Sequence, residues 1–494
     1  MYITVSLLPK HTRNVKCEKP LPIFGNNIRN YLGYVSFTER SLEVYRKYEN
    51  EKVIGYYRGP RPELMVRDPD VIRRILTADF GHFHPRGLGR NPDAEPLLNN
   101  LFHVDGDRWR LLRQRLTPAF TTGKLKAMFP LIIECAEKLQ RIATDSAAKN
   151  TDCDVREMMA RFTTDFIGAC GFGIHMDSLE DGNSQFRALG RKIFTPTLRS
   201  VAILALKDLF PGVGIYLPPV NRIQEDILDI FTSIKNQRNG NPSGRNDFVD
   251  LLLELQAKGK IVGPSIEHTK QDGTPEQAEL EMDMNVMTAQ LFVFFAAGFE
   301  TSSSATSYTL HQLAFNQDVQ EKVYEDIRSV LARYDNKLCY DAINEMAYLD
   351  MAFKEGMRMF PSLGTLHRVC ARKYTIPEVD VTIDPGVRIL IPIMAIQNDE
   401  KYFKDPSKFI PERFSPENSK DRHKFVYLPF GDGPRACIGA RLGQMQSLAG
   451  LAAVLHKFRV EPGTTTRRIP EISHSSNVVQ SIKGGLPLRL VPRT

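Results

Sequence analysis

The segment from 285 to 315, NVMTAQLFVFFAAGFETSSSATSYTLHQLAF, constrains the fold more than any other part of the sequence. It contains no proline, and its middle is apolar nearly all round rather than along one stripe. A helix of that kind belongs in the interior of a large domain. Glu300 and the Ser/Thr run after it interrupt the apolar stretch, so the segment is not a clean membrane span. It predicts a long buried helix that other elements surround.

Other segments predict a mainly α fold with a few short strands. Helical spacing marks residues 31–49, much of 105–260, 348–360 before Pro361, and the stretch after Cys437. Alternation predicts two strands around a Gly-Pro turn within 52–68 and short strands within 374–383 and 387–393. Residues 17–26, 236–247 and 258–277 predict an extended lead-in and two loops, the last one polar and exposed. Strands and helices do not alternate, which argues against a dinucleotide-binding fold.

Charge and cysteine content exclude several classes of protein. The 494 residues carry 65 Lys+Arg against 58 Asp+Glu, a net charge of +7 that does not by itself indicate nucleic-acid binding. A basic face for an acidic partner or an anionic membrane stays open. The seven cysteines are widely spaced and form no C-x-x-C pair, which excludes a disulfide scaffold or a zinc finger and indicates a reducing compartment.

The decapeptide FGDGPRACIG at 430–439 sets the main chemical question. Its cysteine is a buried small residue, a metal ligand or a nucleophile. Glycines let the backbone approach a flat ligand, and the following helix directs its positive end at the Cys437 sulfur. With Arg435 nearby, these features predict a lowered thiol pKa. For the cysteine taken alone, a buried structural residue at a helix start is the simpler interpretation.

The whole motif F-x-x-G-x-R-x-C-x-G resembles the haem-binding loop of the cytochrome P450 family. Phe430, Gly433, Arg435, Cys437 and Gly439 fill its positions. The resemblance implies the fold of that family, a large helical domain with a long central helix over the haem plus a small β-rich lobe. It also implies haem b (iron protoporphyrin IX) as cofactor and the Cys437 thiolate as the axial ligand of the iron.

A second motif, E-x-x-R, lies on the helix predicted at 348–360. Glu355 and Arg358 share one helix face at i, i+3 spacing and can pair. An isolated pair of this kind is most often a surface salt bridge of little value. Because PERF (411–414) follows before the cysteine loop, the resemblance implies a buried triad of Glu355, Arg358 and Arg413.

The stretch AAGFETS at 296–302 resembles the family's oxygen-binding groove in the central helix. The resemblance implies that Gly298 leaves room beside the iron, and that Glu300 and Thr301 form a catalytic acid–alcohol pair that delivers protons. The simpler alternative is that Thr301 and the serines after it bond back to helix carbonyls.

Several arginines match the family's binding site for the haem propionates. Trp109, the single tryptophan, and Arg113 form W-x-x-x-R, which resembles an indole N–H and a guanidinium that hold two carboxylates. Arg435, Arg368 in LHRVC and Arg86 in HPRG match other propionate-binding positions. For each arginine alone, a solvated surface charge is the alternative.

The apolar part of the central helix also predicts a pocket for a hydrophobic ligand. Phe292, Phe295, Ala296, Ala297 and Phe299 are expected to line it near the iron. Plain core packing is the alternative for the phenylalanines. Residues 87–106 and 194–222 are expected to complete the pocket, and their sequences identify no compound.

The resemblance extends from KPLPIFGN (19–26) to the C-terminal strands, in the family's order. It is closest to the microsomal branch and to insect detoxification members. It implies one domain over 17–494. Residues 1–16 are expected to be the remnant of an N-terminal membrane anchor, since YITVSLL is too short for a span or a signal peptide. The implied location is the cytosolic face of the endoplasmic reticulum membrane.

The implied activity is monooxygenation of a hydrophobic small molecule, such as an insecticide, a plant toxin, or an endogenous lipid or hormone. Electrons are expected from NADPH through NADPH–cytochrome P450 reductase, with cytochrome b5 as a further candidate partner and no nucleic acid. Basic residues are expected to form the docking face for that acidic partner, namely Arg108, Arg110, Arg115, Lys424 and Arg441.

Two rival functions remain open from the sequence. One is a haem-thiolate enzyme that rearranges peroxides without O₂ or a reductase. Such relatives usually lack the groove threonine, which is present here as Thr301. The other is a non-catalytic protein that only holds haem or a ligand.

Overall fold

The computed structural model describes residues 15–89, 94–195, 197–214, 216–220, 223–245, 247–474 and 479–493. The expected anchor remnant at 1–16 lies almost wholly outside these residues, as do parts of 87–106 and 194–222. Within the described part of the chain, no helix is both long and apolar enough to cross a membrane.

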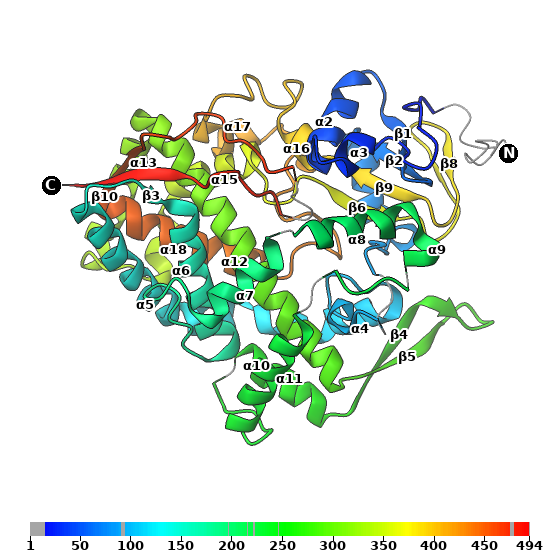
Figure 1. Ribbon diagram of the computed structural model, residues 1–494, viewed down its shortest axis with the longest axis horizontal. Helices are drawn as coiled ribbons and strands as arrows, with labels where there is room; N and C mark the ends of the chain where they lie inside the picture. Colours follow the sequence, from blue (N-terminus) through cyan, green and yellow to red (C-terminus); the bar gives the residue numbers. More distant parts are fainter. Residues whose placement is uncertain are drawn as a thin grey trace.

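The helical part forms most of the molecule (Figure 1). Its α-helices are α1 (Ile28–Tyr31), α2 (Phe37–Lys47), α3 (Pro69–Arg73), α4 (Gly106–Leu116), α5 (Thr122–Ala148), α6 (Val155–Ile167), α7 (Gln185–Phe194), α8 (Leu198–Leu209), α9 (Pro211–Gly214), α10 (Gln224–Gln237), α11 (Phe248–Ala257), α12 (Met284–Phe315), α13 (Gln317–Leu331), α14 (Tyr340–Glu345), α15 (Ala347–Met359), α16 (Ile393–Gln397), α17 (Pro416–Ser419) and α18 (Ala440–Lys457).

Within the described residues, the strands form four small sheets. The strands are β1 (Val53–Arg58), β2 (Arg61–Val66), β3 (Cys153–Asp154), β4 (Lys260–Thr269), β5 (Pro275–Glu281), β6 (Leu366–Val369), β7 (Tyr374–Ile376), β8 (Val381–Ile383), β9 (Arg388–Ile391), β10 (Phe458–Pro462) and β11 (Pro487–Pro492). The largest sheet has the order β1-β2-β9-β6, with β2 and β9 parallel. These strands and α2 form the β-rich lobe near the N-terminus (Figure 1).

Helix α12 is the long buried helix that the sequence predicts, and it runs through the middle of the molecule (Figure 1). The Asp283 side chain caps it by accepting a hydrogen bond from the Val286 N–H at 2.7 Å. Helices α6, α15 and α18 pack against it. The predicted helices at 348–360 and after Cys437 are α15 and α18, and the predicted strands are β1, β2, β7, β8 and β9, so these predictions are confirmed.

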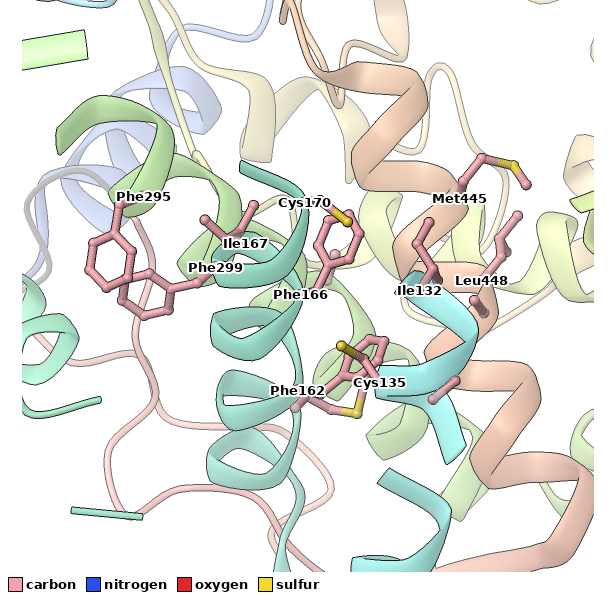
Figure 2. Packing of buried hydrophobic residues seen from close by; sticks show 14 of the residues in the cluster. Ile132, Cys135, Phe162, Phe166, Ile167, Cys170, Phe295, Phe299, Met445 and Leu448 are labelled. Carbon is pink, nitrogen blue, oxygen red and sulfur yellow. The ribbon is translucent and has the colours of Figure 1, made fainter. Parts of the chain in front are cut away.

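Among the residues that the structure describes, two hydrophobic clusters hold the fold together. The larger one lies among the helices, where side chains of α5, α6, α12 and α18 meet (Figure 2). The smaller one lies in the β-rich lobe, between the largest sheet and helices α2 and α3. Burial raises the pKa of the Cys135 thiol to about 12 in the larger cluster, so this cysteine acts as a small apolar side chain.

The prediction of an exposed loop at 258–277 is wrong, because this polar segment forms most of the hairpin β4–β5. The hairpin packs on α4 and projects from the body of the molecule (Figure 1). The Asp107 carboxylate accepts hydrogen bonds from the Ser265 hydroxyl at 2.7 Å and from the Ile266 N–H at 2.6 Å. Contacts with α4, which the polar composition does not reveal, therefore support the hairpin.

Candidate active site

The loop 430–439 places Cys437 directly before α18. The Cys437 N–H donates a hydrogen bond to the Phe430 carbonyl at 2.9 Å, which closes the loop into a tight turn. Gly433 has φ +76°, and a Cβ there would lie 1.8 Å from the backbone oxygen of Leu76. Only glycine fits this position, so Gly433 lets the loop press against the neighbouring chain. Gly439, by contrast, has ordinary space at its Cβ position.

Cys437 faces a cavity of about 1720 Å³. Phe430 and Gly439 of the cysteine loop line it together with residues of α12, β6 and α4. The described part of residues 87–106 and 194–222 also contributes to its wall, as predicted. A cavity of this size accepts a large flat group together with a second, apolar molecule.

Burial raises the pKa of the Cys437 thiol, whereas the Gly439 N–H and the charges of Arg113 and Arg86 lower it. The predicted net lowering of this pKa is therefore wrong. The desolvation of the sulfur outweighs the favourable charges, and Arg435 turns its guanidinium away to other partners. A metal cation at the sulfur would deprotonate the thiol outright.

Arg435 is buried beside the cavity and keeps one donor unused. Its Nε donates to the His84 carbonyl at 2.6 Å, and its Nη2 donates to the Val104 carbonyl at 3.0 Å and to the Asp105 carboxylate at 2.8 Å. Its Nη1 is buried and has no hydrogen-bond partner among the described residues. Burial lowers the pKa of Arg435 to about 9.

Arg368 makes fewer hydrogen bonds than Arg435 does. It is 2% exposed, and its Nη1 donates to the carbonyl of the neighbouring His367. Its Nε is buried and lacks a hydrogen-bond partner within the described residues. Burial, together with the nearby charges of Arg86 and Arg435, holds the pKa of Arg368 well below its usual range.

Arg86 and Arg113 line the cavity near Arg435 and Cys437. Arg86 donates to the Arg435 carbonyl at 2.8 Å, and Arg113 donates to the Ala436 carbonyl at 2.9 Å. Burial lowers the pKa of Arg86 to about 10. Four guanidinium groups thus line one cavity wall, with the Asp105 carboxylate beside them. Buried donors without partners and excess positive charge match the two carboxylates of haem b.

Trp109 lies in the same wall and is 4% exposed. The guanidinium carbon of Arg435 lies 4.3 Å from the centre of the indole ring, which is a cation–π contact. Trp109 therefore supports Arg435 directly, a contact that the W-x-x-x-R motif does not reveal.

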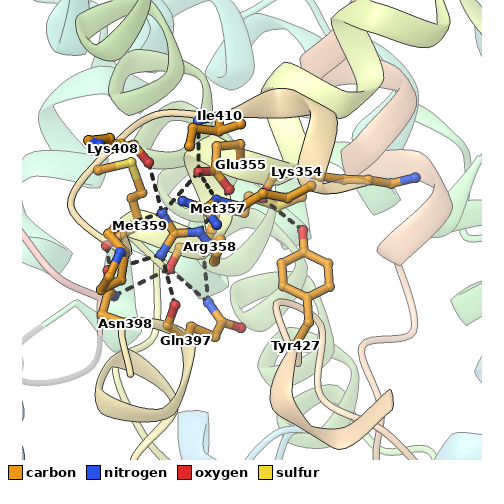
Figure 3. Close-up of polar contacts among 12 residues, drawn as sticks. Lys354, Glu355, Met357, Arg358, Met359, Gln397, Asn398, Lys408, Ile410 and Tyr427 are labelled. Atoms are coloured by element: carbon orange, nitrogen blue, oxygen red, sulfur yellow. Dashed lines mark hydrogen bonds and ion pairs between the residues drawn. The ribbon is translucent and has the colours of Figure 1, made fainter. Parts of the chain in front are cut away.

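Behind the cysteine loop, the structure brings Glu355, Arg358 and Arg413 together. The Glu355 carboxylate accepts two hydrogen bonds from Arg358, at 2.7 and 2.9 Å, and one from Arg413 at 3.2 Å. Glu355 and Arg358 are fully buried. Arg358 also donates to the carbonyls of Gln397 and Pro406. Figure 3 shows the bond to Gln397.

The groove residues of α12 do not all face the cavity. Thr301 lines it, and its hydroxyl donates to the Ala297 carbonyl at 2.7 Å. Glu300 is not among the lining residues; its carboxylate pairs with Arg156 of α6. A Cβ on Gly298 would lie 2.3 Å from the Ile167 side chain. Gly298 lines the cavity. Because it has no side chain, α12 packs closely on α6 at this position.

The prediction that Phe295 and Phe299 line the pocket is wrong. Both lie outside the cavity lining and pack in the helical cluster near Ile167 (Figure 2). Their ring centroids are 5.2 Å apart, and Phe299 also meets Phe194 edge to face. Phe292, Ala296 and Ala297 do line the cavity. Because α12 is apolar all round, its sequence does not show which face is turned to the cavity.

Sequence reasoning missed Asp105 and Arg156. The Asp105 carboxylate accepts hydrogen bonds from the Arg86 and Gly87 N–H groups at 2.7 and 3.0 Å, as well as from Arg435. An aspartate before a predicted helix is usually taken as its cap, but this one makes no capping bond to α4. Arg156 carries no motif that would have linked it to Glu300.

A cavity-facing cysteine before a helix, a wall of buried arginines with unused donors, and a long helix across the cavity define a haem-thiolate oxygenase. The family model described as Cytochrome P450 matches residues 15–487. Cytochrome P450 6a2 of Drosophila melanogaster is 36% identical over 97% of this chain and 94% of its own length. Cytochrome P450 6B2 of Helicoverpa armigera is 37% identical over 97% of this chain and 93% of its own length.

The chain belongs to the cytochrome P450 family. The predicted fold class and the resemblance are thereby confirmed. It is an oxidoreductase, a haem b monooxygenase.

Proposed function

We propose that this chain oxidises apolar foreign compounds or endogenous lipids with electrons from NADPH, delivered by NADPH–cytochrome P450 reductase and assisted by cytochrome b5. The observation that carries the proposal is the meeting of three features in one cavity. These are the Cys437 thiol, the unused donors of Arg368 and Arg435, and a wall in which apolar surface predominates.

In this proposal, residues of the chain bind the haem and hold or transfer protons. Arg368, Arg435, Arg86 and Arg113 would bind the propionates, and Cys437 would bind the iron. When bound, haem b supplies oxygen activation, which a thiolate ligand favours. The Thr301 hydroxyl holds a proton at the cavity wall. Glu300 exchanges protons with the groove only when its ion pair with Arg156 opens, because its carboxylate is engaged there.

The basic face for the reductase includes Arg108, Arg110 and Arg115 on α4. Arg110 and Arg115 donate to carbonyls of the hairpin, at 3.4 and 3.3 Å. Such long bonds leave their charges available to an acidic partner. Lys424 and Arg441 extend this face, although Lys424 pairs with Asp432 at 2.8 Å. Charge reversal of Arg108 and Arg441 should slow reduction and weaken its salt dependence in stopped-flow experiments; unchanged kinetics would contradict this docking face.

The proposed location is the cytosolic face of the endoplasmic reticulum membrane. Large apolar side chains are exposed on α8, α9 and the N-terminal segment, namely Leu21, Ile23, Leu32, Tyr34, Leu198, Leu206, Phe210 and Val213. The turn between β1 and β2 lies between the two regions, because Arg61 donates to the Lys207 carbonyl of α8 at 3.4 Å and Gly25 of the N-terminal segment forms a β-bridge with Arg58. An exposed apolar patch of this kind favours contact with lipid.

The test is reduction of the haem-loaded chain by NADPH and reductase under carbon monoxide, which needs no known substrate. We expect rapid formation of the carbonyl complex that depends on both NADPH and reductase. A chain that is not reduced, yet converts cumene hydroperoxide without NADPH, would be a peroxide-rearranging enzyme instead. A chain that does neither would be a haem-binding protein only.

A further inference from the structure

Helix α4 carries Trp109 and Arg113 into the cavity wall, yet its own residues support its N-terminal end poorly. The helix has 11 residues, and a helix this short depends on packing for its stability. Arg108 lies in the first turn, where the helix dipole disfavours a positive charge. Asp105 precedes α4 but makes no capping bond to it, and its carboxylate accepts hydrogen bonds from other segments instead. The first turn of α4 therefore depends on contacts from elsewhere in the chain.

The hairpin β4–β5 supplies these contacts through an irregular segment of its first strand. The register shifts between Pro264 and Thr269, which leaves residues 265–268 of β4 outside the regular pairing with β5. We call this segment the bulge. A β-bulge turns side chains and backbone groups away from the ladder, and it is a specific feature of a fold rather than a defect. Here the bulge lies against the N-terminal end of α4.

Ser265 is the centre of the bulge and is 4% exposed. Its hydroxyl donates to the Asp107 carboxylate at 2.7 Å and accepts hydrogen bonds from the N–H groups of Glu267 at 3.1 Å and His268 at 2.8 Å. The Ile266 N–H donates to the same carboxylate at 2.6 Å. One buried hydroxyl therefore shapes the bulge and joins it to the first turn of α4 by a charge-assisted hydrogen bond.

Glu267 of the bulge caps α4 from outside the helix. Its carboxylate accepts a hydrogen bond from the Asp107 N–H at 3.2 Å, and this N–H is one of the donors that a helix leaves unpaired at its start. Gly106 has φ +59°, and a Cβ there would overlap the Glu267 carboxylate, so glycine makes room for this cap. Because Glu267 takes the place of a cap, the Asp105 carboxylate can bond to Arg435.

The rest of the hairpin packs along α4, and β4 is the principal packing partner of this helix (Figure 1). A Cβ on Gly263 would lie 2.8 Å from the Leu111 side chain, so the strand backbone lies directly on the helix. The exposed Arg372 donates to the Ile266 carbonyl at 3.3 Å, a long bond that adds little beside the two short bonds to Asp107.

We propose that Ser265 is a positioning residue for haem binding, because its hydrogen bonds hold the bulge on α4 and thereby hold Trp109 and Arg113 at the haem. Ser265 does not line the cavity, so it acts only through α4. This inference rests on the proposed binding of the haem carboxylates by Arg113 and Arg435. It adds a residue from the polar hairpin, which carries none of the haem-binding motifs.

The experiment uses Trp109, the single tryptophan of the chain, as a reporter of α4. In the haem-saturated full chain, haem quenches the emission of a tryptophan that is held close to it. Ser265→Ala should add a longer-lived component to the Trp109 fluorescence decay. It should also speed the loss of haem to excess apomyoglobin about fivefold, the equivalent of one hydrogen bond. Ser265→Thr keeps the hydroxyl and should retain the wild-type decay and rate.

The matched control lies in the same hairpin. The Thr274 hydroxyl donates to the Asp272 carboxylate at 2.6 Å, and both residues are exposed. Thr274→Ala removes a bond of the same kind that does not reach α4, so it should keep the wild-type decay and rate. If Ser265→Ala does not fold, Glu267→Gln decides. It removes the charge at the start of α4 and should speed haem loss about twofold.

Three results would overturn the proposal. The first is a wild-type Trp109 decay and haem-loss rate in Ser265→Ala. The second is an equal change in Thr274→Ala, which would mean that general loosening of the hairpin is the cause. The third is a lower unfolding free energy of Ser265→Ala with an unchanged Trp109 decay, which would make its role purely structural.

Arg113→Gln separates this inference from the proposed function. Faster haem loss in Arg113→Gln, with none in Ser265→Ala, would contradict the positioning role of Ser265 alone. A wild-type rate in Arg113→Gln would contradict the proposed carboxylate binding and, with it, this inference.

Discussion

Two sites in the molecule hold buried arginines, the network around Glu355 and the cavity that Cys437 lines, and these arginines differ in what their donors do. Arg358 gives its hydrogen bonds to Glu355 and to backbone carbonyls of Gln397 and Pro406. Arg368 and Arg435 face the cavity and each keep a buried nitrogen without a hydrogen-bond partner among the described residues. Arginine therefore bonds fully within the protein at one site and keeps unused donors at the other.

The difference shows how a ligand site can be recognised without a ligand. A buried guanidinium with its donors satisfied within the protein needs nothing else. A buried guanidinium that keeps an unused donor and a depressed pKa, such as Arg435 with a pKa of about 9, is costly unless a further acceptor reaches that donor. The first group is structural, and for the second group we propose binding of the haem carboxylates.

The largest effect on stability is expected in the network of Glu355, Arg358 and Arg413, which we call the closed network. Arg358→Met should lower the free energy of unfolding by about 3–5 kcal/mol, because it leaves the buried Glu355 carboxylate with the long contact to Arg413 and the Ile410 N–H as its partners among the described residues. Denaturant unfolding of the haem-loaded protein measures this. The exposed Arg333→Met should stay within about 0.5 kcal/mol of wild type. A similar small change for Arg358→Met would make the network unimportant and remove the contrast.

A different kind of effect is expected in the cavity group. Arg368→Gln should speed the loss of haem to excess apomyoglobin about 10- to 100-fold, the equivalent of the 1.5–3 kcal/mol of a charge-assisted hydrogen bond. Arg372→Gln, an exposed neighbour that donates to the Ile266 carbonyl, should lose haem at the wild-type rate. If both variants behave alike, the unused donors of Arg368 do not serve the propionates.

The smallest effect on stability is expected for Arg413, and it compares the two arginines of the closed network. Arg413→Gln should cost only about 1 kcal/mol of unfolding free energy, because its hydrogen bond to Glu355 is long, at 3.2 Å, and Arg358 still neutralises the carboxylate. Its haem transfer rate should match wild type. Faster haem loss in Arg413→Gln would show that the two groups are coupled.

Local spacing in the sequence was enough to predict much of this. The i, i+3 pair of Glu355 and Arg358, the proline-free helix and the cysteine loop all depend on short-range patterns. The comparisons confirm the family that these motifs indicated. The roles assigned to Thr301, Glu300 and the propionate arginines stay predictions.

What the sequence could not predict depends on long-range packing. Arg156 reaches Glu300 across 144 positions of the chain. The hairpin β4–β5 is supported by α4 rather than by its own composition. Phe295 and Phe299 lie in the helical cluster because α6 and α7 pack on α12. The pKa of Cys437 is raised because of burial. No periodicity carries this information.

The most direct test of the central claim is the carbon monoxide difference spectrum of the dithionite-reduced protein, with Cys437→Ala alongside. Thiolate ligation predicts the strongly red-shifted Soret band that gives the family its name, and predicts its absence in Cys437→Ala. A band at the position typical of neutral axial ligands in the wild-type protein, or the same spectrum from both proteins, would contradict a Cys437 thiolate at the iron.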